Sequence, residues 1–107
     1  MPSIVWVFFF MVIFVPCVLA QESVTIIIKG HIFEPSKVMV PIGKKIKLII
    51  DNQDETPEEF ESYALNREKV IPGKKQGFVF IGPLKKGTYD FFGEFNRTTA
   101  NGSIVVE

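Results

Sequence analysis

The sequence predicts an all-β fold, a sandwich of about seven or eight short strands with no long helix. First, apolar and polar residues alternate with a period of two in many segments after residue 23, as they do along half-buried strands. Second, glycine, proline, asparagine and aspartate mark turns at intervals of roughly 8–12 residues. Third, no segment keeps the apolar period of 3.6 residues that a long amphipathic helix needs.

The first half of the predicted domain contains three strands separated by turn signals. A β-branched run ends at Gly30, and a shorter run ends at the proline and glycine of residues 41–43. The third run alternates lysine with isoleucine and leucine, and it ends at residues 51–54, where Asp and Asn can hydrogen-bond their own backbone. These strands are expected at residues 24–29, 38–40 and 45–50.

The second half contains five more candidate strands. Proline and glycine follow two of them, at residues 72–73 and 82–83, and mark turns there. The best helix candidate is the link at residues 64–67, which is long enough for one turn at most. The strands are expected at residues 60–63, 68–71, 76–81, 88–92 and 103–106.

Residues 1–20 are predicted to be a signal peptide, and residues 21–107 are predicted to form one small domain. The leader is almost entirely apolar, and Val18 and Ala20 stand at the −3 and −1 positions of a small-residue cleavage site after Ala20. It carries no Lys or Arg, which leaves a retained membrane anchor as an alternative, and Cys17 leaves a lipoprotein as a third. Export predicts a location in the periplasm or outside the cell.

Composition argues against several classes of function for this domain. Cys17 is the only cysteine, so residues 21–107 hold no disulfide, no thiolate ligand and no thiol nucleophile. Lys and Arg number 12, as do Asp and Glu, and the resulting net charge of zero argues against nonspecific nucleic-acid binding. The sequence has no glycine-rich phosphate loop, no HExxH motif and no Ser-His-Asp set, so no enzymatic activity is predicted.

Four segments of the domain resemble the cupredoxin family. Residues 33–43 (FEPSKVMVPIG) resemble its F-x-P-x-x-V-x-V-x-x-G opening, and residues 51–54 (DNQD) resemble the x-N-x-D end of its third strand. Residues 86–92 (KGTYDFF) resemble its P-G-x-Y-x-F-x-C strand, and residues 102–106 (GSIVV) resemble its closing strand. The resemblance implies that the sandwich has a Greek-key topology.

Further segments, TPEEFES, LNREKVIPG and FFGEF, are most similar to a non-blue branch of small exported cupredoxin-like proteins. This branch, and the related N-terminal domain of EfeO-type proteins, is associated with bacterial high-affinity iron permease systems. The resemblance therefore implies an inner-membrane iron permease, or another periplasmic transport component, as the partner. The sequence does not indicate an oligomeric state.

The resemblance also implies where a type 1 copper centre would lie, and its ligands are absent. Such a centre needs two His, a Cys thiolate and a weak axial ligand, usually Met. The corresponding positions hold Glu58, Phe92, Asn96 and Ala100, and Asn96 departs from the branch, which often has His after FFGEF. Type 1 copper electron transfer is therefore not expected, and Phe92 is expected to fill the former copper pocket.

The remaining candidate metal ligands are carboxylates and one imidazole. The resemblance directs Glu58 and Glu94 towards the former ligand pocket, and these are the first candidates. Glu58 shares a strand face with Phe60, which should point into the core, whereas Glu59 and Glu61 share the opposite face by their i, i+2 spacing. His31, the only histidine, lies at the turn after the first strand. Such groups suit Fe³⁺ or Mn²⁺ and, less selectively, Cu²⁺ or Zn²⁺.

Each of these features also has a purely structural interpretation. Glutamates on an exposed strand, and a lone histidine on a turn, are commonly solvated. A buried Glu58 would need a hydrogen-bond partner such as Asn96, Tyr89 or a backbone amide, because an unpaired buried carboxylate costs several kcal/mol. Lysines flank the turns, where they either aid solubility or dock an acidic partner. The core is expected to include Phe60, Phe78, Phe80, Phe91, Phe92 and Phe95.

Two functional hypotheses follow from these observations. The first is an exported periplasmic cupredoxin-like protein without type 1 copper, which binds a metal ion, iron or copper, or delivers it, with iron expected first, to a high-affinity iron transport system. The alternative is a metal-free β-sandwich scaffold or partner-binding module stabilised by its phenylalanine core.

Overall fold

The computed structural model describes residues 3–13 and 22–107. Residues 3–13 are exposed and have no regular secondary structure, whereas the predicted cleavage site lies outside the described residues. Within the described residues, no helix is long and apolar enough to cross a membrane. Residues 22–107 form nine strands and a 3-10 helix, η1 (Glu94–Asn96). The strands are β1 (Ser23–Lys29), β2 (Ile32–Glu34), β3 (Lys37–Val40), β4 (Ile46–Asn52), β5 (Glu58–Ser62), β6 (Arg67–Ile71), β7 (Gln76–Ile81), β8 (Gly87–Gly93) and β9 (Asn101–Val106).

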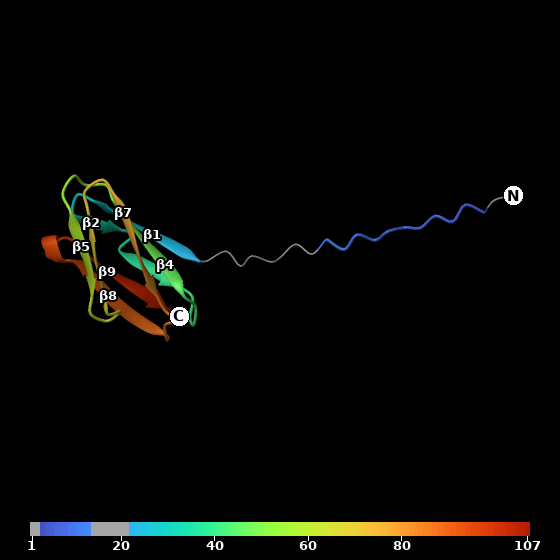
Figure 1. Cartoon of the computed structure of the whole chain (residues 1–107). Helices are drawn as coiled ribbons and strands as arrows, with labels where there is room; N and C mark the ends of the chain where they lie inside the picture. The colour runs from blue at the N-terminus through green and yellow to red at the C-terminus, as the bar shows by residue number, and fades with distance from the viewer. Residues whose placement is uncertain (1–2, 14–21) are drawn as a thin grey trace.

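The strands form two sheets that pack face to face (Figure 1). One sheet has the order β2-β1-β4-β7, and the other has the order β3-β9-β8-β5-β6. The pairs β1–β4 and β3–β9 are parallel, and the other pairs are antiparallel. The predicted all-β Greek-key sandwich is confirmed. It has nine strands because a three-residue strand, β2, forms directly after β1.

Strand alternation determines which side chains enter the core between the sheets. Along β4 and β5 every second residue is buried, so the two-residue period of the sequence becomes an inner and an outer face. Phe33, Phe60 and Phe91 meet at the centre of the core, each at most 1% exposed. The Phe91 ring centroid lies 5.1 Å from that of Phe33 and 5.1 Å from that of Phe60.

Four of the six phenylalanines that were predicted to be in the core lie outside it. Phe78 and Phe80 lie on the outer face of β7, because Val79 and Ile81 take the inner positions. Phe92 likewise faces outwards from β8, and Phe95 in η1 is 51% exposed. A run in which most residues are apolar does not reveal which set of alternate residues faces inwards.

The best helix candidate, the link at residues 64–67, does not form a helix. The chain forms a hydrogen-bonded turn there instead, with the backbone N–H of Asn66 donating to the carbonyl of Tyr63 at 3.2 Å. Asn66 has a φ of 52°, a left-handed conformation that Asn tolerates better than most residues. The single turn of helix is η1, which follows β8.

Asn52 ends β4 and holds the loop that leads to β5. It is fully buried, and its Nδ2 donates to the carbonyls of Thr56 at 2.9 Å and Ile71 at 3.1 Å. Its Oδ1 accepts the backbone N–H of Asp54 at 3.1 Å, the side-chain turn that stops the strand. These hydrogen bonds fix the loop between β4 and β5, and the loop in turn positions Glu58, the first residue of β5.

Candidate functional site

Glu58 is a buried carboxylate whose oxygens are already hydrogen-bonded. It is the first residue of β5, 1% exposed, on the same inner face as Phe60, as strand parity predicted. Its Oε1 accepts the backbone N–H of Phe95 at 2.8 Å and of Glu59 at 3.0 Å. Its Oε2 accepts Nδ2 of Asn96 at 2.6 Å. These hydrogen bonds connect β5 to η1. Asn96 and a backbone amide were among the partners expected for a buried Glu58.

The inner-facing residue of β8 beside Glu58 is Gly93, and this corrects the expected role of Phe92. A Cβ placed on Gly93 would lie 2.6 Å from Glu58 Cδ and 2.7 Å from the Cβ of Ala100. No side chain fits at that position without a rearrangement, because Glu58 and Ala100 already fill the place where the resemblance led us to expect a former copper pocket. Phe92 is one residue out of phase with the pocket and therefore faces the other way.

Glu94 does not join Glu58 in a shared hydrogen-bond network. Its Oε2 accepts hydrogen bonds from both Nε and Nη2 of Arg97, three residues further on. This ion pair raises the pKa of the Arg97 guanidinium above its ordinary value. Arg97 also lies over the Phe92 ring, 4.8 Å from its centroid, and that ring packs on Tyr63 at 5.4 Å.

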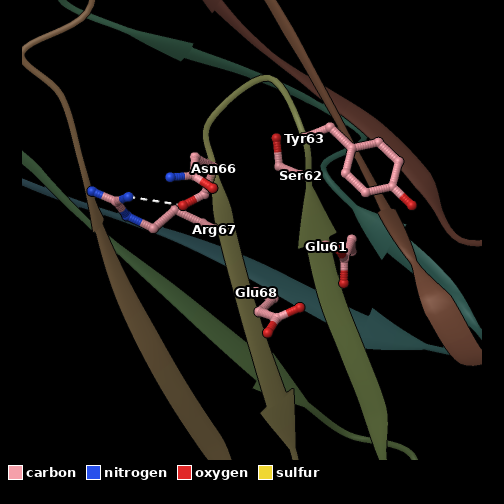
Figure 2. A pocket seen from close by; sticks show the side chains of 6 residues that line it. All are labelled: Glu61, Ser62, Tyr63, Asn66, Arg67 and Glu68. Carbon is pink, nitrogen blue, oxygen red and sulfur yellow. Dashed lines mark hydrogen bonds between the residues drawn. The ribbon is translucent and has the colours of Figure 1, made fainter.

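An open pocket of about 550 Å³ lies beside this stack, at the outer face of β5 and β6 (Figure 2). Glu61 from β5 and Glu68 from β6 reach into it from neighbouring strands. The turn between the two strands closes one end, where Arg67 donates to the carbonyl of Asn66 at 2.9 Å. The pocket is lined by Glu61, Ser62, Tyr63, Asn66, Arg67 and Glu68.

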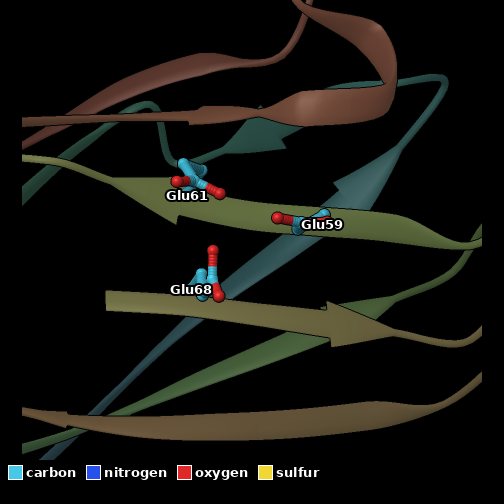
Figure 3. Close-up of side chains that lie close together, drawn as sticks. All are labelled: Glu59, Glu61 and Glu68. Atoms are coloured by element: carbon cyan, nitrogen blue, oxygen red, sulfur yellow. The ribbon is translucent and has the colours of Figure 1, made fainter. Parts of the chain in front are cut away.

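Three glutamates gather on the outer face of the sheet, and we call them the acidic cluster: Glu59, Glu61 and Glu68 (Figure 3). One carboxylate oxygen from each lies within 4.8 Å of the others. Glu61 and Glu68 stand directly opposite each other across the β5–β6 pair, where like charges are unfavourable. Within the described part of the chain, no Lys or Arg forms an ion pair with any of the three.

The acidic cluster changes the protonation of its central member. A hydrogen bond shared with Glu59 raises the pKa of Glu61 from 4.5 to about 7, with help from desolvation and the charges of Glu68, Glu59 and Glu94. The proton relieves the repulsion among the carboxylates, which is the role that a bound cation could take instead.

Glu68 is the functional candidate that the sequence did not suggest. Its signal is its position opposite Glu61 in the β5–β6 hairpin. Glu59 and Glu61 were correctly assigned to one outer face from their spacing of two residues. Finding Glu68 required the register across the turn at residues 63–66, and turn geometry sets that register.

His31 lies apart from the acidic cluster in a hairpin turn. Gly30 and His31 have φ values of 62° and 58°, and they form the two-residue connection between β1 and β2 that favours positive φ at both positions. Asp54 accepts the backbone N–H of Gly30 at 2.8 Å and of His31 at 2.9 Å. The imidazole Nδ1 lies 3.5 Å from Asp54 Oδ2, so Asp54 is the carboxylate beside this histidine.

Replacing Asp54 by Asn is expected to make the free energy of unfolding depend less on pH under acidic conditions. The backbone N–H of His31, with further contributions from Gly30 and nearby charges, lowers the pKa of Asp54 below its ordinary value of 3.8. The ionised form therefore adds stability above pH 3.8, which is lost as pH falls through the lower folded-state pKa. Urea unfolding of both proteins between neutral and strongly acidic pH measures this, and identical pH profiles would contradict it.

Comparisons with known proteins agree with this architecture. A family model described as "Cupredoxin-like domain" matches residues 2–106. An uncharacterised protein of Rickettsia prowazekii (strain Madrid E) is 48% identical over 84 residues, which cover 78% of this chain and 67% of the relative.

Similar solved structures include three proteins whose descriptions name copper. The blue copper protein auracyanin A of Chloroflexus aurantiacus has a TM-score of 0.71 at 14% identity, covering 82% of this chain and 100% of the other. The apo form of a copper-binding protein has a TM-score of 0.69 at 17% identity, with coverages of 79% and 86%. The metal-binding domain of the Cu(I)-exporting ATPase CopA of Streptococcus pneumoniae D39 has a TM-score of 0.67 at 13% identity, with coverages of 79% and 84%. At these identities the similarity establishes the fold alone.

Proposed function

Because the chain belongs to the family of cupredoxin-like domains, we propose that it is an exported, non-catalytic protein that binds a metal ion at the acidic cluster. Iron is the first candidate metal and copper the second. In this proposal the protein delivers iron to an inner-membrane permease. The delivery step draws its support from the sequence resemblance to the EfeO-type branch.

The observation that carries the proposal is the mutual distance of the three carboxylates. Oxygens of Glu59, Glu61 and Glu68 lie within 4.8 Å of one another, a grouping that could hold one metal ion. The set contains no thiolate and no imidazole, so it suits hard oxygen-seeking cations better than Cu(I). A cation would also offset the charges of Glu68 and Glu59 that help to raise the pKa of Glu61.

The residues at the former copper position support a site elsewhere. Glu58 accepts three hydrogen bonds inside the fold, and Gly93 leaves no room for a ligand beside it. For Glu58 to bind a metal it would have to give up bonds that hold η1. Its proposed role is to keep the loop after β8 in place.

We expect Fe²⁺ under argon, Mn²⁺, Cu²⁺ or Zn²⁺ to bind with one-to-one stoichiometry in calorimetric titrations. As the pH is raised towards 7, the apparent affinity for the metal should increase by about tenfold per pH unit, because one proton must leave Glu61 before its carboxylate can bind. Above pH 7 the affinity should level off. Glu61→Gln should abolish binding and the associated proton release.

Glu55→Gln is the matched control, because Glu55 is an exposed carboxylate outside the acidic cluster. It should bind metal as the unaltered protein does. Binding that survives Glu61→Gln and Glu68→Gln would exclude this site. A lack of saturable binding by every metal at micromolar concentration would favour the alternative, a metal-free scaffold or partner-binding module. The supporting observation for that alternative is that Glu58 is buried and its oxygens are already hydrogen-bonded within the fold.

A further inference from the structure

Two turns lie together at the end of the sandwich opposite the hairpin of His31. Residues 41–45 connect β3 to β4, and residues 82–86 connect β7 to β8. The backbone N–H of Gly43 donates to the carbonyl of Leu84 at 3.1 Å. Gly82 approaches the other turn so closely that a Cβ would lie 2.3 Å from the carbonyl oxygen of Lys44. The two turns therefore form one continuous surface.

This surface carries four exposed lysines, and we call it the lysine end: Lys44, Lys45, Lys85 and Lys86. Lys44 pairs with Glu22 at 2.9 Å, and among the described residues no ion pair involves the other three. Ile42, which is 53% exposed, lies in the same surface as an apolar residue among the ammonium groups. An exposed apolar residue among lysines suits a lipid surface, since the apolar side chain enters the interface and the lysines meet anionic headgroups.

The polypeptide enters the domain at this same end. The carbonyl of Glu22 accepts the backbone N–H of Lys47 at 3.0 Å, so β1 begins beside the first lysine-bearing turn. The sequence before β1 contains the uncharged apolar run at residues 4–15. If a membrane holds this run, during export or as an anchor, only a few residues of sequence separate the run from β1. The lysine end would then lie close to the membrane surface. Carboxylates gather at the far end, among them Asp54, Glu55 and Glu58.

We propose that the lysine end binds the surface of a bilayer containing anionic phospholipid. The lysines contact the headgroup phosphates, and Ile42 enters the interface. The carboxylate-rich end then points away from the bilayer. This inference does not depend on metal binding, so each proposal can fail without the other.

The test uses the full chain in vesicles of phosphatidylcholine, with and without phosphatidylglycerol. Acetylation rates of individual lysines are measured by peptide mass spectrometry. Phosphatidylglycerol should slow acetylation of all four lysines of the lysine end by about fivefold or more relative to Lys74 and Lys75 at the opposite end. High salt should remove the difference, because the attraction is screened.

Matched charge reversals make the test specific. Lys85→Glu with Lys86→Glu should abolish the protection of Lys44 and Lys45, whereas Lys74→Glu with Lys75→Glu, the same change in net charge, should leave it intact. Equal acetylation in the two kinds of vesicle would overturn the proposal. Protection that requires an added acidic protein in place of phosphatidylglycerol would also overturn it, by assigning the surface to a protein partner.

Discussion

Replacing Glu58 by Ala is expected to destabilise the domain by about 3–5 kcal/mol, because it removes a buried acceptor and leaves its donors without partners. The N–H of Phe95 and the Nδ2 of Asn96 both donate to this carboxylate across the β5–η1 contact. Urea unfolding measures the loss of free energy. Hydrogen exchange should locate it, since the Phe95 amide should lose its protection before the strands do.

Glu94→Ala is the matched control for this prediction. Glu94 is a glutamate of the same loop, but its ion pair with Arg97 is solvent-exposed and should be worth about 0–1 kcal/mol. Glu58→Gln should fall between the two, because the amide keeps the volume and one acceptor oxygen. A free energy of unfolding for Glu58→Ala close to that for Glu94→Ala would show that the carboxylate does not hold the loop.

Replacing Phe60 by Ala should cost about 3–5 kcal/mol, because it opens a cavity at the centre of the core. Phe60 is fully buried and packs against Phe33 and Phe91, with ring centroids 6.3 Å and 5.1 Å away. For a domain of this size the loss corresponds to a fall in Tm of more than about 12 °C. Differential scanning calorimetry measures the change.

Phe78→Ala provides the comparison on the outer face of the other sheet. Phe78 is 48% exposed, and its main polar contact is the Lys47 ammonium, 4.3 Å from the ring centroid. Its loss should cost about 1 kcal/mol or less. If Phe78→Ala and Phe60→Ala lowered Tm equally, the assignment of inner and outer faces would be wrong.

The sequence was most informative where polar and apolar residues alternate strictly. In β5 the period of two placed Glu58 and Phe60 inside and Glu59 and Glu61 outside, and the burial of each residue agrees. In β8, Phe91 and Phe92 are adjacent and equally apolar, so the sequence pattern does not show which of them faces inwards. Assigning the strand one residue out of phase placed Phe92 inside, whereas it lies on the outer face. Alternation identifies faces only when the two faces differ in polarity.

The acidic cluster shows a different limit. Two of its members lie two residues apart in one strand and could be paired from local geometry. Glu68 joins them only because the turn at residues 63–66 places it directly opposite Glu61. That register depends on the left-handed conformation of Asn66 and on contacts made elsewhere in the fold, which no local pattern specifies.

The position of β9 determines when during synthesis the domain can form. This strand lies between β3 and β8, pairing Val38 with Ile104 and Tyr89 with Ile104 from its two sides. Until residue 106 is available, the five-stranded sheet is divided into two parts with nothing to join them. The five-stranded sheet should therefore form only after β9 has been synthesised, by slow long-range pairing. A growing chain that still lacks β9 would stay unfolded, and under the export proposed above that is the state that a translocation channel can thread.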